Sequence, residues 1–220
     1  MILPDAYKFL SELKENNNKA WFDENRKRYE QIRQSVVLTA ELLIHEISDF
    51  DKSVSGIQPK NCIFRINRDI RFSNDKSPYK TNMGIFVTPG GKNASMAGYY
   101  MHIEPGNSFL SGGIYIPPSP VLKAIRQEIY SNYDEFLGII NDSEFKDEFT
   151  DFWGEKLKTK PKGFPDDFEG LEYLRLKHYA VIKPENDELM TSEKLIGEIR
   201  KVYAALYPLN RFINQAIKEI

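Results

Sequence analysis

The sequence predicts an α+β fold in which an antiparallel sheet of about four to six strands packs against N-terminal and C-terminal helices. Three observations support this prediction. Apolar residues recur at three- and four-residue steps near both ends of the 220-residue chain. Between these ends, residues 61–117 alternate with a period of two, and short connections join consecutive strands, as in antiparallel sheets. No repeat or linker divides the chain, so residues 1–220 are expected to form a single α+β domain.

Two helices are expected at the N-terminus, over residues 5–15 and 19–48, and an Asn16-Asn17-Asn18 turn separates them. The second helix carries an apolar row at helical spacing, in which Asn25 is the one polar residue. Such a row is typical of a helix that packs on a core.

Four strands are expected next, over residues 63–72, 83–88, 98–104 and 108–116. The last two flank Glu104-Pro105-Gly106-Asn107. Proline presets the first central turn angle and glycine accepts the positive φ of the second, so this sequence predicts a type II turn.

The C-terminal part is expected to be mainly helical. The sequence predicts helices over residues 120–130, 132–140 and 144–152, a long loop over 154–170 and a further strand over 173–182. A final helical region begins at Ser192. Pro208 is expected to break or kink it before residues 211–220, because proline lacks the amide hydrogen and clashes with the preceding turn.

The composition is that of a globular protein, with 41% hydrophobic and 28% charged residues, which argues against disorder. The net charge of −2 gives no reason to expect a general polyanion binder. The single cysteine, Cys62, excludes an internal disulfide and is expected to be a buried thiol. The first residues do not resemble a signal peptide, and no apolar run reaches the ~20 residues that cross a bilayer, so a cytoplasmic protein without a membrane partner is expected.

The densest polar chemistry lies in residues 64–82, an alternating segment that runs into a loop. Alternation places Arg65, Asp69 and Arg71 on one face of the expected strand. Asp69 can pair with one neighbouring arginine, which leaves the other free for bidentate contact with a phosphate or carboxylate. Arg68 falls on the apolar face and needs an acidic partner. Salt bridges that hold the sheet to the helices are the structural alternative for these arginines.

The loop after this strand combines carboxylates, lysines and hydroxyl groups. Asp75 is a candidate partner for Arg68, and Pro78 stiffens the loop. Lysines and backbone amides in a stiff loop can cradle an anion, although a rigid strand connector is the plainer interpretation. The residues expected to bind a ligand across the strand and loop are Arg65, Arg68, Asp69, Arg71, Asp75, Lys76, Tyr79 and Lys80.

Tyr100, His102 and Glu104 alternate onto one face of the strand expected over residues 98–104. A histidine and a glutamate at this spacing can act in acid/base chemistry, so His102 and Glu104 are the candidate catalytic residues. Hydrogen-bonded structural groups are the alternative. No metal is expected, because His45 belongs to the long helix and His178 lies near a distant strand, so neither supplies an evident third ligand.

A second basic segment, residues 154–164, carries four lysines at alternate positions. An extended chain would place them on one side, where they could close over an anionic ligand or follow a nucleic-acid backbone. Only Phe164 offers nearby stacking, so a solvated loop is the simpler interpretation and nucleic acid is an unfavoured but open alternative.

The chain resembles, over nearly its whole length, the bacterial and fungal family called domain of unknown function 2461. Residues 64–82 are similar to its signature Arg-Asp-x-Arg-Phe-Ser-x-Asp-Lys-(Ser/Thr)-Pro-Tyr-Lys-Thr. The other segments that carry the resemblance are residues 17–22, 98–106, 154–158, 161–164 and 174–177. The resemblance implies a single-domain α+β protein, and it implies no activity, cofactor or substrate.

Three functions are therefore open. The first is binding of a phosphate- or carboxylate-bearing small molecule through residues 64–82, with His102 and Glu104 as the acid/base pair if the protein is an enzyme. The second is a non-enzymatic interaction protein whose arginines and aspartates form an internal salt-bridge network. The third is nucleic-acid binding, which requires the two basic segments to be contiguous in space.

Overall fold

The computed structural model describes residues 3–219. Within this range the helices are α1 (Pro4–Glu15), α2 (Lys19–Glu24), α3 (Arg26–Ser48), α4 (Ser119–Ser131), α5 (Tyr133–Asn141), α6 (Ser143–Glu148), α7 (Leu171–Leu174), α8 (Asp187–Met190) and α9 (Leu195–Lys218). The strands are β1 (Met83–Val87), β2 (Gly98–Ile103), β3 (Ser108–Ile114), β4 (Phe152–Trp153) and β5 (Tyr179–Glu185).

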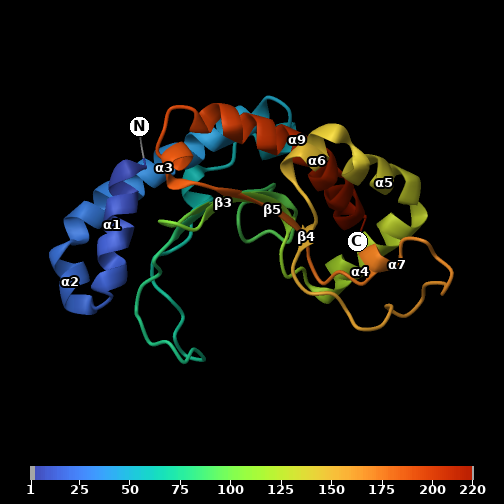
Figure 1. Cartoon of the computed structure of the whole chain (residues 1–220), viewed down its shortest axis with the longest axis horizontal. Helices are drawn as coiled ribbons and strands as arrows, with labels where there is room; N and C mark the ends of the chain where they lie inside the picture. The colour runs from blue at the N-terminus through green and yellow to red at the C-terminus, as the bar shows by residue number, and fades with distance from the viewer. Residues whose placement is uncertain (1–2, 220) are drawn as a thin grey trace.

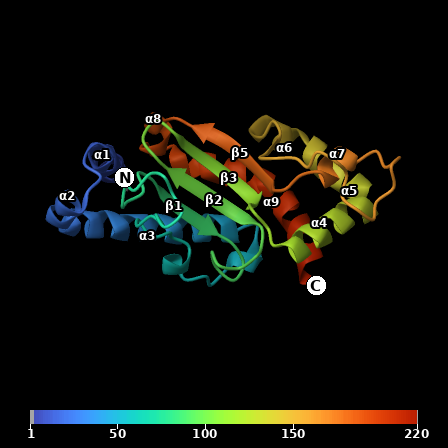
Figure 2. The same ribbon diagram turned by 90° about the horizontal axis from the view of Figure 1, so that it is seen from below.

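The strands form one antiparallel sheet in the order β1-β2-β3-β5-β4. This confirms the predicted α+β fold and the number of strands. Helices α3 and α9 cover one face of the sheet, as Figure 1 shows with the sheet nearly edge-on. Figure 2 looks onto the opposite face, which no helix covers. The fold therefore has a covered face that forms the core and an uncovered face that can form a site.

Alternation in β2 decides which side chains reach the core. Tyr99, Met101 and Ile103 are at most 1% exposed, and the ring of Tyr99 lies 5.3 Å from that of Tyr203 in α9. These apolar side chains contribute the hydrophobic free energy of the core. The intervening residues of β2 point to the uncovered face, as the period of two predicts.

Helix α9 packs closely against the sheet. A Cβ atom at Gly112 would overlap the side chain of Leu206, so glycine is required where α9 crosses β3. The buried side chain of Asn214 accepts from the amide of Ala97 at 2.8 Å and donates to its carbonyl at 3.0 Å. Asn210 donates to the carbonyl of Gly98 at 3.1 Å. These bonds fix α9 to the start of β2.

A cluster of ion pairs fixes β5 to α6 and α9. Lys183 in β5 lies 2.5 Å from Glu148 in α6 and also contacts Glu198 in α9. Lys201 of α9 lies 2.6 Å from Glu148, whose side chain is only 1% exposed. A buried carboxylate requires such cationic partners, so these contacts fix the relative positions of the three elements.

The predicted strand over residues 63–72 is wrong. Only its first residues join β1, through bonds from Phe64 to Gly84 and from Phe86 to Cys62. Residues 66–80 then fold back on themselves as a hairpin, here called the finger, with bonds from Lys80 to Ile66 and across the isolated Asn67–Tyr79 bridge. Beyond Arg65 the chain pairs with the following loop and not with the sheet, and it already turns at residues 70–73, so Phe72 of the expected apolar face is 96% exposed. Figure 1 shows the finger, in teal, projecting beyond the uncovered face.

Three further boundaries differ from the sequence predictions. The expected helix over residues 19–48 is interrupted at Asn25, whose backbone leaves the helical region with ψ of 9°. The expected helix over 144–152 ends at Glu148, and Phe152 enters β4. The expected strand over 173–182 begins only at Tyr179, since the residues before it form α7 and a short connection. The type II turn is supported by a φ of 75° at Gly106.

Pro208 does not break the last helix. Helix α9 runs continuously through it to Lys218, because the neighbouring Leu206 and Leu209 are fully buried. Packing of these side chains outweighs the one backbone hydrogen bond that proline removes. The last residue of the predicted helix, Ile220, lies outside the described residues. No helix between residues 3 and 219 combines the length and apolar character needed to span a bilayer.

The Gly112→Ala variant tests the close approach of α9. The added Cβ would overlap Leu206 and lie 2.5 Å from the carbonyl oxygen of Gly98, so we expect the unfolding free energy to fall by ~1–3 kcal/mol. Gly138→Ala in α5 is the control, because its Cβ meets nothing within 4 Å and alanine favours a helix by ~0.5–1 kcal/mol. Chemical denaturation measures both, and equal stabilities for the two variants would contradict the close packing.

Candidate functional site

The uncovered face of the sheet carries a cleft with a volume of about 670 Å³, here called the sheet cleft. Strands β2, β3 and β5 form its floor. Residues 63–66 and 80–86 form one wall, and residues 115–118 with Trp153 form the other. A cleft of this volume matches the ~300–1,000 Å³ of small-molecule sites. Its aromatic lining residues are Tyr29, Phe64, Phe86, Tyr100, Phe109, Tyr115 and Trp153.

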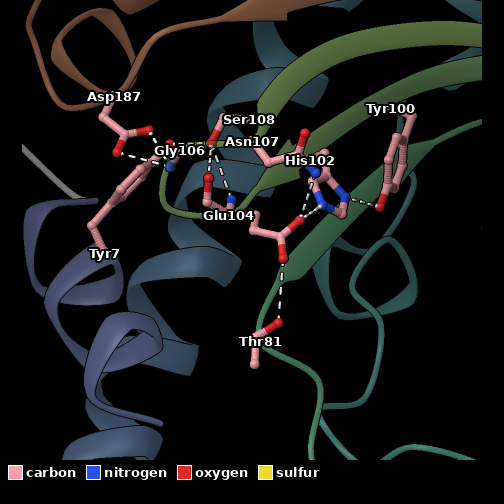
Figure 3. Close-up of polar contacts among 9 residues, drawn as sticks. All are labelled: Tyr7, Thr81, Tyr100, His102, Glu104, Gly106, Asn107, Ser108 and Asp187. Atoms are coloured by element: carbon pink, nitrogen blue, oxygen red, sulfur yellow. Dashed lines mark hydrogen bonds and ion pairs between the residues drawn. The ribbon is translucent and has the colours of Figure 1, made fainter. Parts of the chain in front are cut away.

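A chain of hydrogen bonds runs along β2 on the cleft side (Figure 3). The hydroxyl of Tyr100 lies 2.9 Å from Nδ1 of His102, and Nε2 of His102 lies 3.0 Å from Oε2 of Glu104. The strand produces this arrangement because alternate residues of an extended chain share one face. The structure thus brings together His102 and Glu104, the two candidate catalytic residues, and adds Tyr100 to them.

Glu104 is held in its ionised form. Burial raises the pKa of Glu104, but hydrogen bonds from Asn107 at 2.9 Å and from His102 outweigh it, so this pKa lies below the ordinary value of 4.5. Thr81 contributes a further bond at 3.3 Å. An ionised Glu104 accepts a hydrogen bond from Nε2–H of His102, which leaves Nδ1 as the acceptor for the Tyr100 hydroxyl.

His102 has no free ring nitrogen. Its two nitrogens bond to Tyr100 and Glu104, and its ring stacks on Phe109 with centroids 4.5 Å apart. Both Tyr100 and His102 line the sheet cleft, so a ligand there lies beside a phenol and an imidazole that are already hydrogen-bonded. Sequence reasoning placed Tyr100 on the correct face but gave it no role. The two-residue spacing of the two polar rings and the acid in Tyr100, His102 and Glu104 was the signal that could have identified it.

Tyr100 lies over a glycine of the neighbouring strand. A Cβ at Gly84 would lie 2.6 Å from the Tyr100 hydroxyl oxygen, so the absence of a side chain there makes room for the phenol. Burial, followed by the charge of Glu104, raises the pKa of Tyr100 to about 12. The phenol is consequently neutral at physiological pH and donates a hydrogen bond to Nδ1 of His102.

The turn that follows Glu104 is fixed from both sides (Figure 3). Ser108 donates to the carbonyl of Glu104 at 2.8 Å and is itself bonded to Tyr7 of α1 at 2.5 Å. The amide of Gly106 donates to the carboxylate of Asp187 at 3.0 Å. The position of the Glu104 carboxylate is therefore determined by contacts from α1 and α8 as well as by its own strand.

Arg65 and Lys80 both line the sheet cleft. Within residues 3–219, neither forms an ion pair with an acidic side chain. The ammonium of Lys80 lies 5.6 Å from the ring centroid of Phe64, a cation–π distance. Burial, followed by the like charge of Arg65, lowers the pKa of Lys80. Two cations that repel each other beside an apolar surface form a favourable position for an anion.

The other charged residues of the signature pair within the finger. Arg68 pairs with Asp75, the partner expected from the sequence. Arg71 makes two bonds to Asp69, at 2.9 and 2.6 Å. Bonds from Ser77 and then from Arg68 lower the pKa of Asp75.

Lys76 donates to the carbonyl of Ile70 at 2.9 Å. Neither Lys76 nor the four paired residues Arg68, Asp69, Arg71 and Asp75 line the sheet cleft.

Tyr79 attaches the finger to the N-terminal helices and does not face the sheet cleft. Its ring stacks on Phe22 with centroids 3.9 Å apart. The side chain of Asn17 donates to the carbonyl of Tyr79 at 2.9 Å and accepts from its amide at 3.1 Å. Two separate segments of the family resemblance, around Asn17 and Tyr79, therefore meet at the base of the finger.

The second basic segment lies far from the first. The finger and the loop over residues 154–170 occupy opposite ends of the molecule, as both views show. Lys160 pairs with Asp166 at 3.0 Å. The two basic segments therefore do not form the contiguous surface that a nucleic-acid interface was expected to need. Over residues 3–219, His, Cys, Asp and Glu side chains form no group of three or more that could hold a metal ion.

Comparison with known proteins gives one finding. The model of a family described as "Conserved hypothetical protein (DUF2461)" matches residues 5–212. Neither the curated proteins nor the solved structures give a match. The matched range contains the finger, the Tyr100–His102–Glu104 chain and all residues that line the sheet cleft.

The Glu104→Gln variant tests the ionisation of Glu104. The pKa of Glu104 is lower in the folded state than in the unfolded state, where it lies near 4.5. The ionised carboxylate therefore stabilises the fold at pH values above the unfolded-state pKa. This stabilisation is lost as the pH falls through the folded-state pKa. We therefore expect the melting temperatures of wild type and variant to differ most at neutral pH and to converge in acid. Thermal unfolding from about pH 7 to about pH 3 measures this, and a difference that stays constant would argue against an ionised, hydrogen-bonded Glu104.

Proposed function

The chain belongs to the DUF2461 family of conserved hypothetical proteins, and we propose that it binds a phosphate- or carboxylate-bearing small molecule in the sheet cleft. One observation carries the proposal: in the described part of the chain, the charged residues that line the cleft are all cations. They are Arg33, Arg65, Lys80 and Lys92. Arg65 and Lys80, from the predicted strand and loop, are the residues proposed to hold the anion.

Cations without a carboxylate partner beside an apolar surface cost free energy, and Arg65 and Lys80 are in this position. An anion relieves the repulsion that lowers the Lys80 pKa and supplies charge-assisted hydrogen bonds, each worth ~1.5–3 kcal/mol. The planar guanidinium of Arg65 suits two oxygens of one phosphate or carboxylate.

Acid/base catalysis is the second candidate function, and the Tyr100–His102–Glu104 chain supports it. A ligand with an acidic X–H group over Tyr100 transfers that proton to the phenol oxygen while the phenol proton passes to Nδ1 of His102. The products are the X⁻ ligand and an imidazolium that faces the Glu104 carboxylate. This route requires no free phenolate, whose formation the raised pKa of Tyr100 disfavours.

Two alternative functions remain, an internal salt-bridge network in a non-enzymatic protein and nucleic-acid binding. The paired side chains of the finger support an internal salt-bridge role for Arg68 and Arg71. The separation of the two basic segments gives nucleic-acid binding no support. We also propose a cytoplasmic location, because Cys62 is a buried free thiol without a disulfide partner.

A thermal-shift screen against phosphorylated metabolites, nucleotides and carboxylates tests the anion site. A ligand at 100 times its Kd stabilises the fold by about 2.7 kcal/mol, a shift of a few degrees. We expect Arg65→Ala and Lys80→Ala each to weaken binding by about tenfold or more, since each removes a charge-assisted contact.

Arg71→Ala is the matched control, because it deletes a guanidinium of the same segment that lies outside the cleft lining. We expect this variant to keep both the ligand shift and the melting temperature of the wild type. Loss of binding in Arg71→Ala with retention in Arg65→Ala would place the anion on the finger and overturn the cleft assignment.

A further inference from the structure

The end of the sheet cleft opposite Arg65 and Lys80 carries an aromatic platform formed by Tyr115 and Trp153. Their ring centroids lie 5.5 Å apart, and the residues are 59% and 48% exposed. Large aromatic side chains are normally buried against a core, because each removes ~150–250 Å² from water. Two exposed neighbouring rings at a cleft wall therefore present free surface for a ligand.

The backbone around this platform adopts unusual conformations. Ile116, next to Tyr115, has a φ of 47°, a left-handed conformation that is costly for a β-branched residue. Its amide donates to Nδ1 of His178 at 3.1 Å. Gly154, next to Trp153, has a φ of 109°, and a Cβ there would lie 2.5 Å from the His178 ring. Ile116 therefore carries backbone strain, Gly154 supplies the close approach that only glycine allows, and both contact His178, so the platform is held in place.

Small residues form part of the floor between the two ends of the cleft, beside the larger Ile182, which lies opposite Ser111. Ser111 lies opposite Tyr100 in the register, and Gly113 and Ala180 lie between Gly98 and Trp153. All three small residues line the cleft. These three positions leave free volume above the floor, between the aromatic side chains at the two ends.

Charge differs between the two ends. The four cations of the lining come from α3 and from the chain around β1, whereas the wall formed by residues 115–118 and Trp153 carries none. Burial lowers the pKa of His178, so this histidine adds no charge near the platform at neutral pH. The cleft is therefore cationic at one end and neutral and aromatic at the other.

We propose that the ligand is an aromatic anion: its phosphate or carboxylate contacts Arg65 and Lys80, and its planar ring stacks on Trp153 and Tyr115. This inference rests on the proposed anion site and assigns the chemical class of its ligand. Stacking on an aromatic side chain is tolerant of ring identity, so the class includes nucleoside and flavin monophosphates. Ringless anions lack the second contact.

The test compares phosphates with and without a ring. The probes are ribose 5-phosphate, adenosine monophosphate and flavin mononucleotide, and calorimetry measures their Kd values. We expect both ring-bearing phosphates to bind at least about tenfold more tightly than ribose 5-phosphate. We also expect adenosine monophosphate to change the tryptophan fluorescence, to which only Trp21 and Trp153 contribute.

Variants separate the two ends of the cleft. We expect Trp153→Ala to reduce the affinity for adenosine monophosphate to that for ribose 5-phosphate, while the latter stays unchanged. Trp21→Phe, in α2 away from the cleft lining, is the control that keeps both the affinity and the fluorescence change.

Two results would overturn the inference alone, and a third would overturn it together with the proposed anion site. Equal affinities for ring-bearing and ringless phosphates would support the anion site but contradict stacking of a ligand ring on Trp153 and Tyr115. Equal losses for all three probes in Trp153→Ala would show that the tryptophan supports the fold and not the ring. Absence of binding by every probe would count against the proposed anion site itself, together with the inference that rests on it.

Discussion

Close packing of α9 on one face of the sheet is the constraint on which the rest of the structure depends. Gly112 allows the helix to approach β3, and Asn210 and Asn214 fix it to the start of β2 through buried hydrogen bonds. With α3 beside it, α9 buries the apolar half of each strand. The other half of each strand is left without a covering helix, so aromatic, polar and small side chains there can line a cleft.

Residues 64–82 have three separate physical roles, and the composition of this segment does not show which residue has which role. Tyr79 attaches the finger by stacking on Phe22 and pairing with Asn17. The arginines and aspartates of the finger neutralise one another, Arg68 with Asp75 across the hairpin and Arg71 with Asp69 two residues away. Arg65 and Lys80, which stand where the finger leaves the sheet, are the cations that reach the cleft. Dense charge in this segment is therefore partly structural and partly available to a ligand.

The sheet cleft contains several features that are individually unfavourable in a folded protein. It combines unpaired cations, exposed aromatic rings and a residue in the left-handed region. Each of these features costs free energy in the isolated protein, and such departures from local consistency concentrate at functional sites. Tyr100, His102 and Glu104 form the contrasting part of the site, because their hydrogen bonds are already satisfied by one another.

The sequence by itself determined the periodicities and some local pairings. It was sufficient for the α+β class and for the faces of β2, because these depend on alternation, and it offered Asp75 as one of the possible partners of Arg68, which the structure shows to be the partner. Tertiary structure alone decided that residues 66–80 leave the sheet, that Pro208 is tolerated in α9, and that Trp153 shares a cleft with Arg65. The physical reason is that a strand pairs with whichever edge is available and a cleft joins residues from distant elements, and neither fact is encoded in local spacing.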